Sequence, residues 1–213
     1  MARMETPRHQ QSLGNWLLYA WGTYPLQLLG INLLFLAACI PVVTIPAAVC
    51  ALHAVVQRFY RVRLAESMSR LFWREFLGAF VSRTLLTLGA LAVPLAAVLL
   101  LRDLLSTAVW LVLSAALLSF ALVALSWFIP QLVLLNLTPG QAMKNACIFT
   151  CLETKVNFLL MALHAVELTV MIFALPTSVF ALLVLPVFHV VLATGLVMPV
   201  LQQRLVHDDA PEE

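Results

Sequence analysis

The sequence predicts an all-α membrane protein, a polytopic bundle of six transmembrane helices with short interfacial helices. Hydrophobic residues make up 63% of the 213 residues and charged residues only 10%, which leaves too little polar surface to cover a water-soluble globule of this size. The charges are also confined to short stretches. Residues 9–57, 84–101 and 104–143 contain no Lys, Arg, Asp or Glu, and 156–203 contain only Glu167. Lipid is therefore the expected solvent for most of the chain.

The uncharged stretches supply the predicted crossings. A helix needs about 20 apolar residues to cross about 30 Å of hydrocarbon. The five segments that meet or approach this length are 24–40, 84–101, 106–129, 156–175 and 177–201. A sixth segment, 47–60, is short. Its length alone fits a re-entrant turn as well as a crossing extended to the interface by Arg58 and Arg61.

The distribution of basic residues favours six crossings over five, because cytoplasmic flanks of membrane helices are enriched in Lys and Arg. If 47–60 crosses and the N-terminus is cytoplasmic, only Arg102 of the 12 basic residues lies outside. If 47–60 does not cross, the arginine cluster within 58–83 falls on the wrong side. We therefore predict six crossings with both termini cytoplasmic. The basic residues placed inside are Arg3, Arg8, Arg58, Arg61, Arg63, Arg70, Arg74, Arg83, Lys144, Lys155 and Arg204.

The chain is expected to form one membrane domain over residues 1–213. Residues 1–23 form an N-terminal interfacial segment, 24–203 the six-helix bundle, and 204–213 an acidic cytoplasmic tail. The short external connections are expected at 39–47, 101–107 and 174–178. Aromatic residues of the kind that gather at membrane interfaces occur at the start of the chain. They are Trp16, Tyr19, Trp21 and Tyr24.

Two stretches are expected to form helices on the cytoplasmic face. Residues 63–83 predict an amphipathic helix in the headgroup plane, because an apolar stripe lies opposite polar residues. We expect Arg63, Arg70 and Arg74 to meet anionic lipid and Phe72 and Phe76 to meet the membrane interior, or alternatively a partner's helix. The apolar stripe of residues 63–83 consists of Leu64, Met68, Phe72, Phe76 and Phe80.

Residues 136–155 are predicted to form the second, shorter helix, which starts at Pro139 after Thr138.

Four ionisable residues fall inside the predicted crossings: His53, His164, Glu167 and His189. A carboxyl group at mid-depth is costly unless it is protonated, paired or in a wet cavity. One interpretation is a neutral Glu167 that hydrogen-bonds His164 and joins helices; another is a substrate or proton pathway. A metal site of three histidines and a carboxylate is disfavoured, because no spacing fixes their convergence.

No enzyme motif is present in the sequence. A phosphate loop, GxSxG, HExxH and CxxC are all absent, so we expect no catalytic residues, no cofactor, no metal site and no nucleic-acid partner. Cys147 and Cys151 are expected to stay reduced, and a disulfide between Cys39 and Cys50 is geometrically conceivable.

Three motifs resemble those of the YesL-like family, domain of unknown function 624. They are NLLFLAACIPVVTIPAAVCALHAVVQRFYR at 32–61, LFWREFLGAF at 71–80 and TPGQAMKNACIFT at 138–150. The chain departs from the family pattern at Pro46, where glycine is usual, and at His53, where an aromatic residue is common. The family has no active site to carry over.

The members of this family are bacterial integral membrane proteins, so the resemblance implies a bacterial inner-membrane protein. Members are often encoded beside carbohydrate importers that depend on binding proteins, which implies a link to oligosaccharide uptake. We expect an accessory or structural subunit of an oligosaccharide ABC importer that contacts lipid and permease subunits, with a homo-oligomer also open. The alternative is a small independent transporter or permease subunit that uses the intramembrane Glu and His groups. Two small-residue faces are candidates for helix packing, either within the chain or against a partner. One face consists of Ala47, Ala48, Ala51 and Ala54, and the other of Ala115, Ala116 and Ser119.

Overall fold

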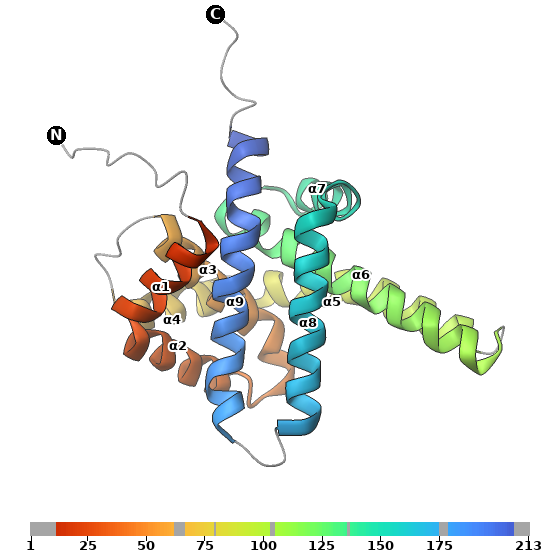
Figure 1. Cartoon of the computed structure of the whole chain (residues 1–213), viewed down its shortest axis with the longest axis horizontal. Coiled ribbons are helices and arrows are strands. Elements are labelled where there is room, and N and C mark those ends of the chain that lie inside the picture. The colour runs from red at the N-terminus through yellow and green to blue at the C-terminus, as the bar shows by residue number, and fades with distance from the viewer. Residues whose placement is uncertain are drawn as a thin grey trace, which may run out of the picture.

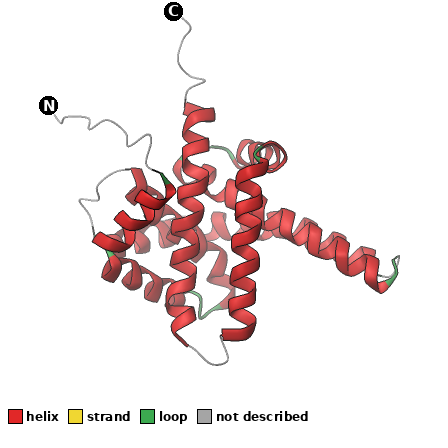
Figure 2. Cartoon of the chain, viewed as in Figure 1, coloured by secondary structure: helices red, strands yellow, loops and turns green. Residues whose placement is uncertain are grey.

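The structure is a computed structural model that describes residues 12–61, 67–78, 80–102, 105–135, 137–174 and 179–206. All regular secondary structure in these ranges is helical (Figure 1 and Figure 2). The all-α prediction is therefore confirmed. The elements are α1 (Leu13–Thr23), α2 (Pro25–Ala38), η1 (Val42–Thr44), α3 (Ile45–Arg61), α4 (Met68–Gly78), α5 (Phe80–Leu101), α6 (Thr107–Leu134), α7 (Pro139–Leu152), α8 (Thr154–Ala174), α9 (Val179–Leu201) and η2 (Gln202–Val206).

Helix α3 lies at the centre of the bundle and contacts α2, α4, α5, α6 and α9. Buried residues make up 67% of its most apolar window, the highest share among the candidate spans. Small side chains allow neighbouring backbones to approach α3 closely. The small residues of this face, each at most 1% exposed, are Ala47, Ala48, Ala51 and Ala54. The segment 47–60, which looked shortest in the sequence, is thus the core of the fold.

The connection before α3 is helical, which lengthens the crossing. The 3-10 turn η1 runs directly into α3, and the hydroxyl of Thr44 lies within hydrogen-bond distance of two carbonyl oxygens, that of Ala38 at the end of α2 and that of Pro41 just before η1. The continuous apolar helix therefore covers Val42–Arg61, 20 residues. Its length suffices to cross a membrane at about 1.5 Å per residue.

The described residues contain four helices that are long and apolar enough to cross a membrane. Helices α7 and α8 pass the same test only as a pair bent by 96°, which would make a fifth span. Helix α2 has 14 residues, or about 21 Å, which is short for a crossing. The chain therefore has the helices of a membrane protein, and the predicted count of six is not confirmed. The four spans are Val42–Arg61, Phe80–Leu101, Thr107–Val133 and Val184–Arg204.

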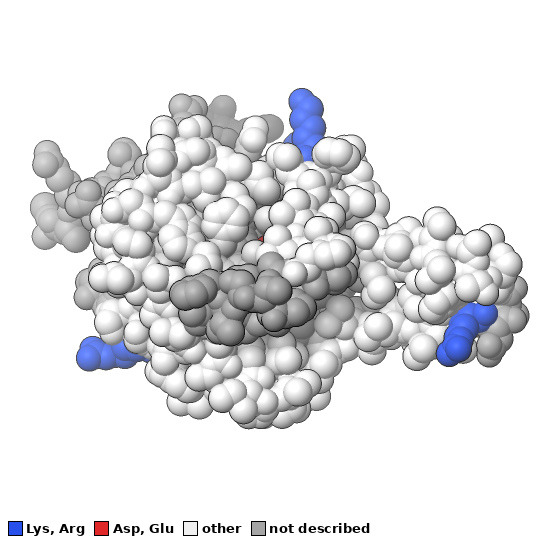
Figure 3. Space-filling model, turned by 60° about the horizontal axis from the view of Figure 1, so that its bottom comes forward, with Lys and Arg blue, Asp and Glu red and all other residues white. Residues whose placement is uncertain are grey.

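The α5–α6 hairpin projects sideways from the rest of the bundle (Figure 1). Buried residues make up only 17% of the α5 span and 6% of the α6 span. Leu99 and Val112 are exposed apolar residues on this hairpin. Figure 3 shows a face of the molecule that is almost wholly uncharged, with Lys and Arg at its margins. An apolar surface of this extent is expected to face lipid or another membrane helix.

The bend between α7 and α8 is held by Asn157. Its Oδ1 accepts the indole N–H of Trp127 at 2.7 Å, and its Nδ2 donates to the carbonyl oxygens of Phe149 at 3.0 Å and Thr150 at 2.8 Å. These two carbonyls lie in the last turn of α7, where Phe149 O also accepts the backbone N–H of Glu153 at 2.9 Å. Asn157 thus fixes α7 across the ends of α6 and α8. The predicted helix start at Pro139 is present, with Thr138 and Gln141 forming a capping box.

The first helix, α1, packs against α9 and the core of the bundle. Trp16 is 1% exposed, and its indole N–H donates to the carbonyl oxygen of Val191 in α9 at 2.8 Å. A Cβ atom at Gly195 would lie 2.6 Å from Leu13 Cδ1 and from Trp16 Cδ1, so this close approach requires glycine. Trp16 thus holds α1 against α9, and the interfacial position of residues 1–23 stays a prediction.

Candidate functional site

A polar pair joins α8 and α9 inside the apolar bundle. His189 Nδ1 lies 2.8 Å from Glu167 Oε1, and each side chain is 17% exposed. A hydrogen bond at this distance needs one proton between the two atoms, carried either by the imidazole or by the carboxyl group. The pair satisfies two polar groups that would each be costly to leave alone among apolar side chains.

The two other predicted histidines lie beside this pair. The ring of His164 packs edge-on against that of His189, with 4.9 Å between ring centroids. His53 is 4% exposed and lies on α3, which packs against α9. The structure therefore brings His164, Glu167 and His189 together, and places His53 on the neighbouring helix α3.

The hydrogen-bond partner of Glu167 differs from the one that the sequence interpretation gave it. That interpretation gave Glu167 a hydrogen bond to His164, three residues earlier on the same helix. In the structure the partner of Glu167 is His189 on α9, while His164 Nδ1 contacts the carbonyl oxygen of Leu160. The hydrogen bond therefore links two helices, and the sequence spacing within α8 did not reveal it.

Two hydrogen bonds hold the part of α9 that carries His189. Pro186 interrupts the helical hydrogen bonding of α9. The backbone N–H of the next residue, Val187, donates to Asn32 Oδ1 on α2 at 3.2 Å. Two residues beyond His189, the carbonyl oxygen of Val191 accepts from Trp16. His189 thus lies midway between two anchored backbone positions, which fixes the direction in which its ring points.

The site has the chemistry of a proton-holding cluster. A carboxyl group and three imidazoles can each take up or release a proton, and the hydrogen bond between Glu167 and His189 can carry one. Gln57 contacts His53 Nδ1 at 3.4 Å, and its own Oε1 is buried with no partner found within the described residues. In the same ranges, no group of three or more His, Cys, Asp and Glu side chains is placed to hold a metal ion.

A second charged site, which the sequence analysis missed, ties α3, α4 and α5 together at one end. Glu75 is 9% exposed and its two carboxylate oxygens lie 2.7 Å from Arg58 Nη2 and 2.9 Å from Arg83 Nη2. Arg83 also donates to the backbone carbonyl of Glu75 at 2.7 Å. A signal was present: Glu75 is an acidic residue between two arginines that each flank an apolar span on the same predicted face.

The proposed lipid contacts of α4 need correction. Phe72 is 0% and Phe76 8% exposed, and the two rings stack on each other inside the core. They face the chain's own helices instead of lipid or a partner, because α4 lays the stripe that contains them against α2 and α3. Arg70 and Arg74 are exposed on the opposite side of the helix. Arg63 lies outside the described residues, as do the other residues of 62–66.

The part of the chain from α2 to the end of α5 matches a known family. Residues 28–102 match the family described as "Protein of unknown function, DUF624". This match confirms the DUF624 resemblance. The DUF624 segment contains His53 and all three residues of the Glu75 cluster, whereas Glu167, His164 and His189 lie beyond it. No curated protein and no solved structure matches the chain.

Proposed function

We propose that this chain is a multi-pass protein of the bacterial cytoplasmic membrane, with both termini cytoplasmic, and serves as a non-catalytic accessory subunit beside the permeases of a carbohydrate ABC importer. The link to an importer rests on the DUF624 resemblance. The proposal of a docking subunit rests on the surface of the α5–α6 hairpin.

The distribution of the charges supports the proposed orientation. The Glu75 cluster joins the end of α3 to the start of α5, and Arg204 Nη2 lies 3.2 Å from Glu153 Oε1 where α9 ends and α8 begins. Arg102 follows the other end of α5, about 28 Å from Arg83 along the helix axis. Under the positive-inside rule, the end that carries most of the basic residues is cytoplasmic.

The two small-residue faces differ in exposure, and this difference carries the proposal. The alanines of α3 are buried within the chain, whereas Ala115 and Ala116 on α6 are exposed and Ser119 is half-buried. In lipid, small side chains let another helix approach closely and gain packing contacts. The small-residue face of α6 is therefore available to a permease helix, whereas the small-residue face of α3 is already packed against helices of the same chain.

The experiment compares two double substitutions in the full-length chain, expressed together with a binding-protein-dependent carbohydrate importer. Ala115→Leu/Ala116→Leu should abolish co-purification of permease subunits in mild detergent and reduce sugar uptake to the level of a deletion strain. Ala92→Leu/Ala96→Leu adds the same apolar volume to exposed positions of α5 and should leave both unchanged. Normal uptake in the deletion strain, together with a monodisperse protein free of partners, would contradict the proposal.

The assembled polar cluster favours a second candidate function, an independent proton-linked transporter. Ionisable residues inside a membrane protein often mark substrate or proton pathways. In vesicles containing the purified chain, this function predicts that a pH gradient drives solute uptake and that Glu167→Gln abolishes this uptake. If the chain is instead a docking subunit, Glu167→Gln will leave permease co-purification intact and the vesicles will show no such uptake.

A further inference from the structure

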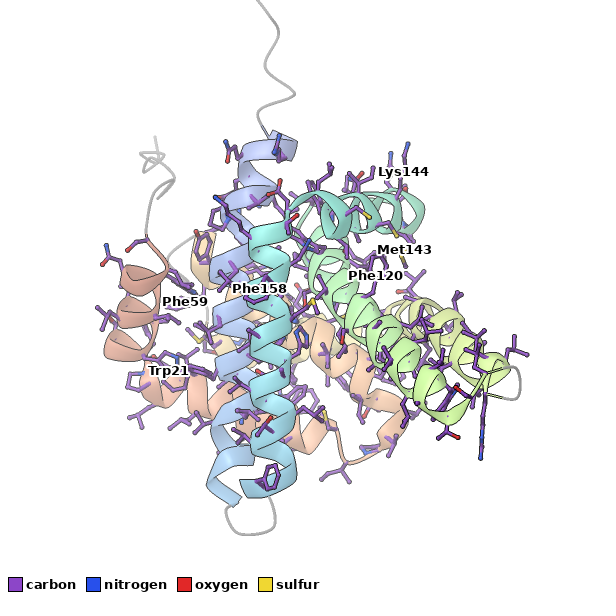
Figure 4. The ribbon with its side chains drawn as sticks, turned by 45° about the vertical axis from the view of Figure 1, so that its right-hand side comes forward. Trp21, Phe59, Phe120, Met143, Lys144 and Phe158 are labelled. Atoms are coloured by element: carbon purple, nitrogen blue, oxygen red, sulfur yellow. The ribbon has the colours of Figure 1, made fainter. Side chains whose placement is uncertain are left out.

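A half-open apolar groove of about 670 Å³ runs between α5, α6 and α7. Its floor is formed by small residues on two helices, Gly89 and Ala90 on α5 and Ala121 and Ala124 on α6, and its upper end by α7 through Met143. Figure 4 shows Met143 on the side of α7 that faces the hairpin, with Phe120 of α6 below it. The groove is distinct from the polar cluster and from the exposed Ala115 face.

The length of the groove fits one leaflet of a bilayer. On α5 it extends from Leu85 to Ala97, or about 18 Å at 1.5 Å per residue, against about 15 Å for half of the hydrocarbon core. An acyl chain of one leaflet spans about the same length, so a phospholipid tail can lie along the groove from Leu85 to Ala97.

A positive charge stands at the end of the groove where a lipid headgroup would lie. Lys144 follows the groove-lining Met143 on α7, is exposed, and points away from the hairpin (Figure 4). Within the described ranges no carboxylate pairs with Lys144, whereas Arg58, Arg83 and Arg204 each contact a glutamate. A cation beside an apolar groove is complementary to a ligand with an anionic head and an acyl chain.

We propose that the groove binds one anionic phospholipid of the leaflet on the α7 side, with an acyl chain against Gly89 and Ala121 and the phosphate near Lys144. The lipid would fill the space between the hairpin and α7, which the chain's own side chains leave empty. This site uses neither the Glu167 cluster nor the proposed permease face.

The test is native mass spectrometry of the delipidated full-length chain in mild detergent, titrated with dioleoyl phosphatidylglycerol or dioleoyl phosphatidylcholine. Gly89→Leu fills the groove, and it is compatible with folding because a Cβ atom at Gly89 meets nothing within 4 Å and Leu has the higher helix propensity. Ala92→Leu is its control, exposed on α5 but outside the groove lining. Lys155→Gln is the control for Lys144→Gln, since it removes one exposed lysine elsewhere on the same predicted face.

The wild-type chain should retain one phosphatidylglycerol more tightly than phosphatidylcholine. Lys144→Gln should lower phosphatidylglycerol affinity about fivefold, the effect of one surface cation on an anionic lipid, and Lys155→Gln should not. Gly89→Leu should remove the single retained lipid of either type, and Ala92→Leu should retain it. Equal retention of phosphatidylglycerol by Gly89→Leu and wild type would overturn the proposal. A lipid-free wild-type dimer that Gly89→Leu dissociates would also overturn it, because a second copy would then occupy the groove.

Discussion

The 2.8 Å contact between His189 Nδ1 and Glu167 Oε1 is a hydrogen bond between two helices in an otherwise apolar part of the bundle. Either residue alone would leave a polar group without its partner. Because the pair lies beyond the matched family segment 28–102, it is a feature of this chain's C-terminal helices. Its energetic role can be measured separately from any role in transport.

We expect strong coupling between these two side chains. His189→Leu and Glu167→Leu should each lower the free energy of unfolding by about 1–3 kcal/mol, because the remaining partner is left unsatisfied. The double substitution should cost less than the sum of the two, since it removes both polar groups. Denaturant unfolding in detergent micelles, followed by circular dichroism, measures the cycle. Additive effects of the two substitutions would show that the contact does not contribute to stability.

Gly195 should not tolerate even a methyl group. Gly195→Ala places a Cβ atom 2.6 Å from Leu13 and Trp16, so α1 must move away from α9. We expect a loss of about 1–3 kcal/mol in unfolding free energy, typical of overpacking, and a red shift of tryptophan emission as Trp16 becomes exposed. Gly22→Ala is the control, because a Cβ atom there meets nothing within 4 Å. Equal stability of the two variants would contradict the close packing of α1 on α9.

The ion pairs of Glu75 and Glu153 should differ in strength. Glu75→Ala leaves two arginines facing each other with no acidic partner and should cost about 1–3 kcal/mol of stability. Glu153→Ala breaks a pair whose Arg204 side chain is 63% exposed, and solvent screening limits that loss to less than about 1 kcal/mol. Unfolding of the two variants in the same detergent makes the comparison. A larger loss for Glu153→Ala would mean that the Glu75 cluster does not hold α3, α4 and α5 together.

The sequence predicted the helical class because charge-free runs are visible without any knowledge of tertiary contacts. It underestimated α3 because Pro41 and Pro46 suggested a loop, whereas the residues between them form a helical turn continuous with α3. It overestimated α2 because the apolar run continues past Ala38 into a turn. Apolar composition alone does not show where a helix ends.

The polar cluster was predicted by residue type, and its pairing was not. Charge inside an apolar run marks Glu167 and His189 separately, but their contact depends on how α8 and α9 pack against each other, which spacing along one helix does not encode. The stripe of Phe72 and Phe76 fits lipid and a protein core equally well, because both are apolar environments. Only the position of α4 against α2 and α3 decides between them.

The orientation in the membrane underlies each functional proposal and is tested most directly by cysteine accessibility in intact cells. The four native cysteines are first replaced. Single cysteines are then introduced at Thr107 and at Ser69, which both lie on the surface of the protein, and each variant is treated with a membrane-impermeant maleimide. The account predicts labelling at position 107 in intact cells and at position 69 only after the membrane is opened. Labelling of position 69 from outside intact cells, with position 107 protected, would contradict it.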